Sequence, residues 1–434
     1  MARKMKDSGI EWIGEIPEGW EVVKAKYLFA QRNEKGNSAL VLLSPTQKYG
    51  VIPQSQLEGV VQVKENTDLR AFKTIHIGDF VISLRSFQGG FEFSNYEGVC
   101  SPAYQVFHAT KDLCNDFFRY LFKSDGFISK INSLTVGIRE GKNIQYWDFS
   151  NMLLALPPKE VQIRSAQYLS AKCTEIDTML SKTRSSIEEH KKLKQAVITQ
   201  AVTKGVRGER EMKDSGVEWI GEIPKTWIIS NIGRFCFVTK LAGFEYTKEM
   251  DGHISPYGDV PIVRAQNIKM GRFIPNTREY ISLALSQKLN RCALNEKCLI
   301  ITFIGAGIGE VALFSDATRH HLAPNVAKIV INHDMKQFLD DRFLLYFLMS
   351  SAGQEEVNKI KKATAQPSLS MQTIRSIKLA FPSTLQEQKE IADFLDAKCA
   401  EIDRLIAKKE QLVKELESYK KSLIYEVVTG KREV

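Results

Sequence analysis

The sequence predicts an α/β (α+β) protein in which two pseudo-repeated α/β domains are joined by two long helices forming an antiparallel coiled coil. Three observations predict this class: a phrase that occurs twice, a second repeated stretch with heptad spacing, and short β-branched runs between the repeats. The chain has 434 residues, which is enough for two or three domains of ordinary size.

The first repeat sets the domain order. It reads M-K-D-S-G-I-E-W-I-G-E-I-P at residues 5–17 and M-K-D-S-G-V-E-W-I-G-E-I-P at residues 212–224, and a tryptophan follows three residues after each copy. A spacing of 207 residues is far longer than a solenoid repeat, so it indicates duplication of a whole domain. We expect each copy to pack against the base of its own domain, and we predict domains over residues 1–155 and 212–381.

The second repeat carries the helices. Residues 169–203 match residues 395–429 at a constant offset of 226, and in both copies apolar residues recur at alternating spacings of four and three. This heptad spacing predicts a seam by which the two helices pair with each other; the alternative is that each helix only covers its neighbouring domain. The predicted seam residues are Leu169, Ile176, Leu180, Ile187, Val197, Leu395, Ile402, Ile406, Val413, Leu416 and Leu423.

Prolines place the helix starts, because proline is tolerated at the beginning of a helix and not in its middle. Pro157 and Pro158 precede the first helix and Pro382 precedes the second. We therefore predict helices from about 159 to 204 and from about 385 to 430. They lie in a central conserved region, 156–211, and a C-terminal conserved region, 382–434.

Composition narrows the class of protein. Hydrophobic residues make up 43% and charged residues 26%, the balance of a soluble globular protein, and no apolar run is long enough for a membrane span. We expect a cytoplasmic protein with free thiols, because the seven cysteines form no Cys-x-x-Cys pair, and we expect no metal site. Sixty Lys and Arg against fifty-one Asp and Glu leave a net charge of +9, which favours a polyanionic partner.

The order of these features resembles a known family. Each half has W-I-G-E-I-P with a following tryptophan, then a variable region, then a proline-bounded heptad helix, the first of which ends in V-T-K-G at residues 202–205. Over essentially its full length the chain resembles the specificity subunit of type I restriction-modification systems.

The resemblance implies a DNA-binding protein without catalytic activity of its own. Its two target recognition domains would each bind one half of a split, asymmetric sequence in double-stranded DNA. The paired helices would set the gap between the two halves and dock two methyltransferase (modification) subunits, and two restriction subunits would complete the assembly. No cofactor is expected in this chain, since S-adenosylmethionine, ATP and Mg would belong to the partner subunits.

Three pairs of segments are candidates for DNA contact. Residues 78–90 and 296–309 are each a β-branched run followed by a glycine loop, and residues 136–146 and 361–370 are polar loops before the helices. Residues 261–272 read as a strand and turn, and their counterpart in the first half holds residues 47–49. Arginine and glutamine can pair with guanine and adenine edges, and lysine mostly meets phosphate. The candidates are Gln47, Lys48, Tyr49, Arg85, Ser86, Gln88, Arg139, Lys142, Asn143, Arg264, Gln266, Asn267, Lys269, Arg272, Thr302, Lys361, Lys362 and Gln366.

Two other functions remain open. F-I-G-A-G-I-G at residues 303–309 is similar to a glycine turn that holds S-adenosylmethionine, so a self-sufficient adenine DNA methyltransferase is one alternative. Against it, L-P-P-K at residues 156–159 lacks the polar and aromatic residues of a base-methylation motif. The other alternative is a coiled-coil scaffold without sequence preference. The sequence contains no Gly-x4-Gly-Lys-Ser/Thr loop for ATP.

Overall fold

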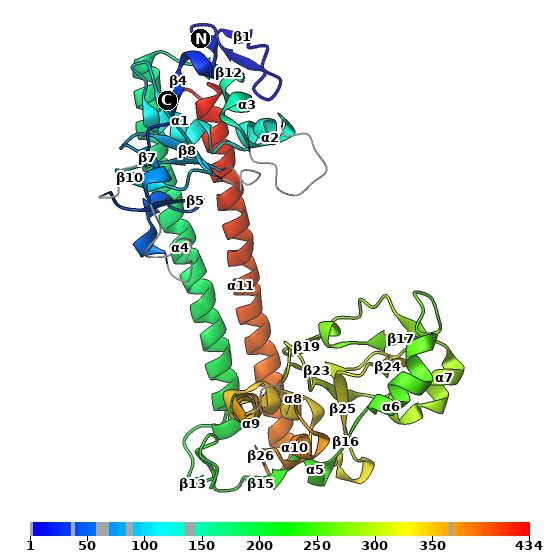
Figure 1. Ribbon diagram of the computed structural model, residues 1–434. Coiled ribbons are helices and arrows are strands. Elements are labelled where there is room, and N and C mark those ends of the chain that lie inside the picture. Colours follow the sequence, from blue (N-terminus) through cyan, green and yellow to red (C-terminus); the bar gives the residue numbers. More distant parts are fainter. Residues whose placement is uncertain (1–2, 36–39, 58–68, 84–89, 135–143, 364–367) are drawn as a thin grey trace. The chain divides into compact units, whose positions relative to one another are not determined.

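The computed structural model describes residues 3–35, 40–57, 69–83, 90–134, 144–363 and 368–434 (Figure 1). The chain divides into two compact units, Met1–Arg184 with Gln411–Val434, and Ser185–Glu410. Each unit contains one copy of the repeated phrase, one mixed α/β domain and a part of each long helix. Within the described residues, no helix is long and apolar enough to cross a membrane.

The first unit is built on an antiparallel sheet with strand order β4-β11-β8-β9. Beside it lie the hairpin β5–β6, the pair β7–β10 and the pair β3–β12, and short helices follow β11. The bounds are β3 Glu21–Lys24, β4 Phe29–Arg32, β5 Leu43–Thr46, β6 Gly50–Pro53, β7 Lys73–Ile75, β8 Phe80–Ile82, β9 Phe91–Phe93, β10 Gly98–Cys100, β11 Gln105–Ala109, α1 Asn115–Leu121, α2 Asp125–Leu134, α3 Tyr146–Ser150 and β12 Leu153–Leu156.

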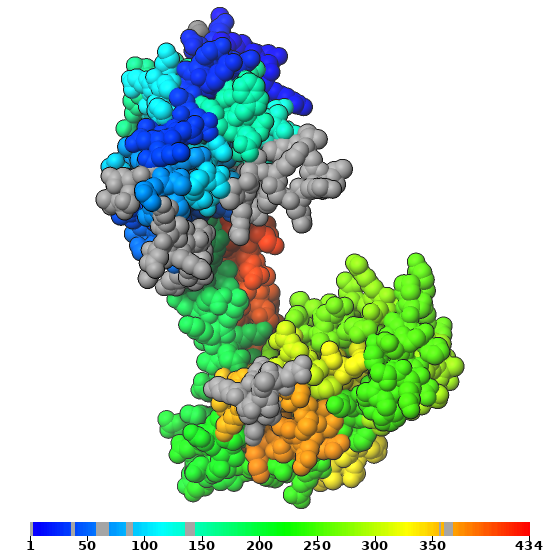
Figure 2. All heavy atoms as spheres, viewed as in Figure 1, coloured from blue at the N-terminus to red at the C-terminus, as the bar shows by residue number. Residues whose placement is uncertain are grey.

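The second unit repeats this topology in the order β16-β25-β22-β23, with β15 paired to β26. A further sheet, β20-β17-β24-β21, shares a core with the main sheet, and it lies with α6 and α7 in the green region at the lower right of Figure 2. The bounds are β15 Ile228–Asn231, α5 Ile232–Phe235, β16 Cys236–Lys240, α6 Gly243–Glu245, β17 Val260–Val263, β18 Ile268–Lys269, β19 Arg272–Phe273, β20 Tyr280–Ile281, α7 Leu283–Lys288, β21 Ala293–Leu294, β22 Cys298–Thr302, β23 Val311–Phe314, β24 His320–Leu322, β25 Val326–Ile331, α8 Asp341–Met349, α9 Ser351–Ala363, α10 Met371–Ser376 and β26 Lys378–Phe381.

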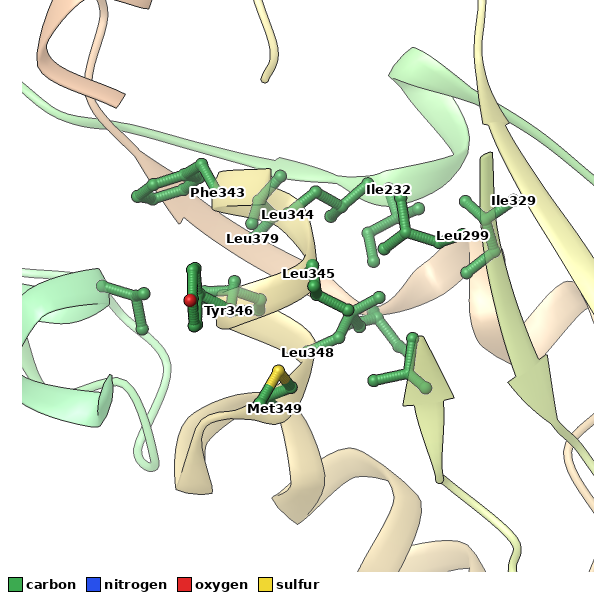
Figure 3. Packing of buried hydrophobic residues seen from close by; sticks show 14 of the residues in the cluster. Ile232, Leu299, Ile329, Phe343, Leu344, Leu345, Tyr346, Leu348, Met349 and Leu379 are labelled. Carbon is green, nitrogen blue, oxygen red and sulfur yellow. The ribbon is translucent and has the colours of Figure 1, made fainter. Parts of the chain in front are cut away.

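Each main sheet is buried on both faces, because alternate side chains of a strand point to opposite sides. In β22, Leu299 and Ile301 join the core formed with α8, whereas Cys298 and Ile300 join the core beneath the further sheet. Figure 3 shows the first of these cores, in which Leu299 and Ile329 face the apolar residues of α8.

The two domains share a scaffold and differ in their side chains. The strands β10 and β24 are 222 residues apart, the same offset at which the sequence aligns the C-S-P-A and L-A-P-N segments. The core of the first unit is rich in phenylalanine, with Phe29, Phe80 and Phe107 packed edge to face or stacked, whereas the second unit uses Ile, Leu and Val at the same sheet. Different cores are compatible with one topology as long as the apolar pattern is kept.

The repeated phrases form the hairpins β1–β2, Met5–Asp7 with Glu15–Pro17, and β13–β14, Met212–Asp214 with Glu222–Pro224. Each packs where a long helix ends at a glycine with positive φ, +80° at Gly205 and +74° at Gly430. A Cβ atom at Gly430 would come within 2.4 Å of Pro17, and one at Gly205 within 3.3 Å of Trp227. The predicted packing of each phrase against its domain is therefore also a helix-capping arrangement.

The two long helices are α4, Lys159–Lys204, and α11, Leu385–Val428, and all of the predicted seam residues are buried or half-buried. In the first unit Lys420 Nζ donates to Asp177 Oδ1 at 2.7 Å, and Arg184 pairs with Glu417. In the second unit Lys194 Nζ donates to Asp403 Oδ1 at 2.7 Å. Higher numbers on α4 meet lower numbers on α11, so the predicted antiparallel pairing is confirmed.

Candidate nucleic-acid interface

Three segments predicted to contact DNA meet at one end of the main sheet of the second unit. At this end β22 finishes and β23 begins. The tip of the β18–β19 hairpin lies there, because Gly271 N donates to Val311 O at 2.8 Å. So does the polar segment before α10, because Leu369 N donates to Phe303 O at 2.8 Å. We call this surface the loop end; it comprises Lys240 and residues 264–272, 303–310, 323–325 and 368–370.

The glycine loop of the loop end is pinned at both ends and bare at its tip. Phe303 N donates to Asn325 O at 3.1 Å, and Gln354 Nε2 donates to Gly309 O at 3.0 Å. Gly305 has a φ of +98°, is exposed, and has no other heavy atom within 4 Å of where a Cβ would be. Because the anchored tip, Gly305 to Gly307, carries no side chain larger than the methyl group of Ala306, another backbone, such as a phosphodiester, can approach closely.

Cations flank this loop. Lys269 and Arg272 stand exposed on the β18–β19 hairpin, and Lys269 Nζ lies 3.3 Å from Glu310 Oε2. Lys240 ends β16, and its Nζ lies 4.4 Å from the ring centroid of Phe303. Arg272 makes no ion pair with any residue that the structure describes. The side chains at this end can therefore neutralise phosphates without first breaking buried ion pairs.

The segment after β17 supplies polar side chains of two kinds. Gln266 is exposed, whereas Arg264 is half-buried and paired with Glu279. Burial is the largest single influence and lowers the pKa of Arg264, but the hydrogen bonds and charges of Glu279 and Tyr246 together outweigh it and raise the pKa. Gln266 is thus available to a ligand, and Arg264 is held as a fixed positive charge.

Two candidates do not fit a contact with DNA. Asn267 is 2% exposed, and its Nδ2 donates to Ile274 O and Asn276 O, both at 3.0 Å. Its amide ties the segment before β18 to the segment after β19. Thr302 is fully buried within the sheet, since it is the last residue of β22. A polar residue type in the right segment does not show which way the side chain faces.

The other candidates lie in the β5–β6 turn of the first unit, at the end of α9 or outside the described residues. In the first unit Gln47, Lys48 and Tyr49 form the exposed β5–β6 turn, and Lys48 Nζ lies 4.8 Å from the ring centroid of Tyr49. Lys361 and Lys362 lie in the last turn of α9 and not in a loop, since Lys-Lys-Ala favours helix; their side chains are outside the described part. The candidates outside the described residues are Arg85, Ser86, Gln88, Arg139, Lys142, Asn143 and Gln366.

Sequence reasoning missed two polar residues of the loop end, Lys240 and Asn325. Lys240 follows a strand that pairs with β25, and nothing in its local sequence marks it. Asn325 had a signal, because it stands in the L-A-P-N segment that aligns with C-S-P-A in the first half. At this aligned position the first half has Ala103 and the second half has Asn325. Such a change from a small to a polar residue between two similar domains indicates a candidate for selective contact.

Comparison with known proteins agrees with this architecture. Residues 224–416 match the family described as the Type I restriction modification DNA specificity domain. The MjaVIII specificity subunit of Methanocaldococcus jannaschii, a type I restriction enzyme subunit, is 23% identical over 429 residues, covering 96% of this chain and 93% of that protein. Residues 224–416 belong to this family, and the whole chain is similar to type I restriction-modification specificity subunits.

Other relatives extend over the same length. The putative MjaX specificity subunit of the same organism is 25% identical and covers 96% of this chain and 95% of its own. Among solved structures, a chain of a type I restriction-modification system has a TM-score of 0.73 at 14% identity, covering 96% of this chain and 99% of its own. The HsdS subunit of Thermoanaerobacter tengcongensis has a TM-score of 0.54 at 16% identity, covering 96% and 98%.

These matches confirm the resemblance predicted from the repeated phrases and helices, and the structures confirm the fold class. The relatives that the chain matches are specificity subunits, the non-catalytic recognition members of their systems.

Proposed function

We propose that this chain acts as a specificity subunit, that it binds a bipartite, asymmetric DNA target, and that each unit contacts one half of it. The observation that carries the proposal is the loop end of the second unit, where independently predicted segments converge on one surface. The net charge of +9 supports a polyanionic ligand. In the first unit the equivalent contacts are assigned to the β5–β6 turn and to the candidate segments around residues 85–88 and 139–143.

The chemistry divides by residue type. Lys240, Lys269 and Arg272 bind phosphates, which fixes the position of the domain on the duplex without reading sequence. Gln266 reads a base edge, because a carboxamide can both donate and accept and so pairs with adenine in the major groove. The bare glycine tip lets the sheet end approach the DNA backbone.

Docking of the partner subunits is assigned to the outer faces of the helices. On α11 the exposed residues Leu405, Leu412 and Tyr419 recur every seven positions, and on α4 Met179 and Leu193 are exposed 14 positions apart. Met179, Leu405 and Leu412 directly precede the seam residues Leu180, Ile406 and Val413, so these side chains extend the apolar stripe beyond the seam. Met179 is equivalent to Leu405, and Leu193 to Tyr419, at the offset of 226. Two equivalent stripes fit two copies of one helical partner, the modification subunit.

Genome-wide mapping of methylated adenines tests the proposal. Strains with and without this gene, both expressing the modification subunit, are compared by single-molecule sequencing. A split motif should be present only when the gene is present, and unchanged methylation would refute the proposal. Methyl transfer by the purified chain alone would instead favour a self-sufficient methyltransferase, and equal affinity for random and selected duplexes would favour a scaffold.

A further inference from the structure

The turn between β24 and β25 presents one amide side chain at the centre of the loop end. It consists of Ala323, Pro324 and Asn325 and joins the two main structural layers of the second unit. Asn325 is exposed, and among the described residues its side-chain amide has no hydrogen-bond partner. Exposed amide side chains are common on protein surfaces, but this one stands on a turn that backbone hydrogen bonds hold in place.

Three backbone hydrogen bonds fix this turn. Ala323 N donates to Val263 O at 2.9 Å, Val326 N donates to Ala323 O at 3.2 Å, and Phe303 N donates to Asn325 O at 3.1 Å. Asn325 is therefore tied to the β17 segment, which leads to Gln266, and to the glycine loop. A side chain held on a rigid support loses little conformational entropy on binding and discriminates geometry well.

The first unit has the same turn without the amide. Ser101, Pro102 and Ala103 follow β10 as Ala323, Pro324 and Asn325 follow β24, and Ala103 is exposed like Asn325. The scaffold of the turn therefore does not need an asparagine. Because the backbone requirement is met by alanine in one copy, the amide of the other copy is free to serve recognition.

We infer that Asn325 is a specificity-determining residue that reads an adenine in the half of the target bound by the second unit. This inference rests on the proposed function. The carboxamide accepts from adenine N6 and donates to N7, a paired contact that no other base offers in the major groove. Replacing it should relax the choice of base at one position and leave the other positions unchanged.

The test is selection of bound duplexes from a pool with 30 randomised base pairs, using the full chain with its modification subunit. Wild type should yield a split motif with a fixed adenine in one half. Asn325→Ala should lose preference at that base pair alone, by about 5- to 150-fold, the equivalent of 1–3 kcal/mol for a paired base contact. Thermal unfolding should not change, because alanine already occupies the equivalent turn.

Two matched variants sharpen the test. Gln337→Ala removes an exposed amide beyond the opposite end of β25 and should leave the motif intact. Ala103→Asn places the amide on the other copy and should alter only the other half of the motif. If wild type selects a motif and Asn325→Ala selects the identical one, the assignment of Asn325 is wrong while DNA recognition stands. If wild type selects no motif, both fail.

Discussion

Two adjacent residues of α4 distinguish the buried seam from the outer stripe. Leu180 is 6% exposed and belongs to the core that includes Leu423 and Val427 of α11, whereas Met179 is 45% exposed. The two side chains are similar in size and both residues favour helix, so their replacement by alanine changes little except the contacts on each face. The pair therefore isolates the contribution of helix pairing.

Leu180→Ala removes three carbon atoms from a buried site. At about 0.8 kcal/mol per buried methylene this costs about 2.4 kcal/mol before any cavity term. Two paired helices close over a gap more readily than a full core, so a loss of about 2–3 kcal/mol, near the lower end for buried Leu→Ala, is expected. Met179→Ala should stay within about 0.5 kcal/mol, as for surface substitutions.

Urea unfolding of the full chain, followed by circular dichroism at 222 nm and by tryptophan fluorescence, measures both variants. Two compact units need not unfold together, so the transition midpoints are compared phase by phase. Leu180→Ala should lower the midpoint of the phase of the first unit, with unchanged slope. If Leu180→Ala and Met179→Ala cost the same, the seam is not the surface at which the helices pair. Met179→Ala should instead weaken binding of the modification subunit, which pull-down with that subunit measures.

Three further outcomes follow from single sites. Burial raises the pKa of Glu92 from 4.5 to about 7, partly offset by its ion pair with Lys123, so the folded state keeps a proton that the unfolded chain loses. This stabilisation is full below pH 4.5 and is lost by about pH 7, amounting to at most about 3 kcal/mol, and Glu92→Gln should flatten the pH dependence of the unfolding midpoint. Glu387→Val should destabilise the second unit by about 2–3 kcal/mol in urea unfolding, because Arg210 and the indole N–H of Trp227 lose their acceptor; an unchanged midpoint would contradict that. Raising salt from 50 to 200 mM should weaken DNA binding steeply in a fluorescence-anisotropy titration. Arg272→Gln should reduce the slope of log affinity against log salt concentration by about 1, the contribution of one phosphate contact.

The helices and repeated phrases could be predicted because each rests on local rules. The heptad spacing specifies which side of a helix is buried, and prolines and glycines mark where helices begin and end, so Lys159 and Gly205 bound the first helix as expected. The fold class followed from the same patterns. Residue periodicity shows which face of a helix is buried, whichever element packs against that face.

The side chains of the loop end could not be predicted in the same way. Thr302 and Gln266 are both polar residues in predicted loops or strand ends, yet one is fully buried and the other exposed. The difference depends on strand register, which long-range pairing with β25 decides and local sequence does not. Lys240 reaches this surface for the same reason. Recognition residues are therefore identified by where the sheet ends, and not by residue type alone.

The two units differ in some side chains at equivalent positions, and these differences show which features the fold requires. The tryptophan that follows the repeated phrase is buried in both units, at Trp20 and Trp227, but only Trp227 has a hydrogen-bond acceptor, Glu387. The position equivalent to Glu387 in the first half is Val161. Packing of the indole is thus shared and its hydrogen bond is not. The same reasoning separates the turn that both units need from the amide that only Asn325 provides.

The paired helices give the last prediction, which concerns the gap in the target. Deleting seven residues removes two helical turns, about 10 Å, and preserves the heptad register. Removed from α4 alone, these residues should disrupt the reciprocal pairs Asp177–Lys420 and Lys194–Asp403, because α11 keeps its length. Removed from both helices between these pairs, they should leave both pairs intact and shorten the unread gap of the methylation motif by about three base pairs, since a helical turn of DNA is about 34–36 Å. A gap that stays the same after the matched deletion would show that the helices do not set it.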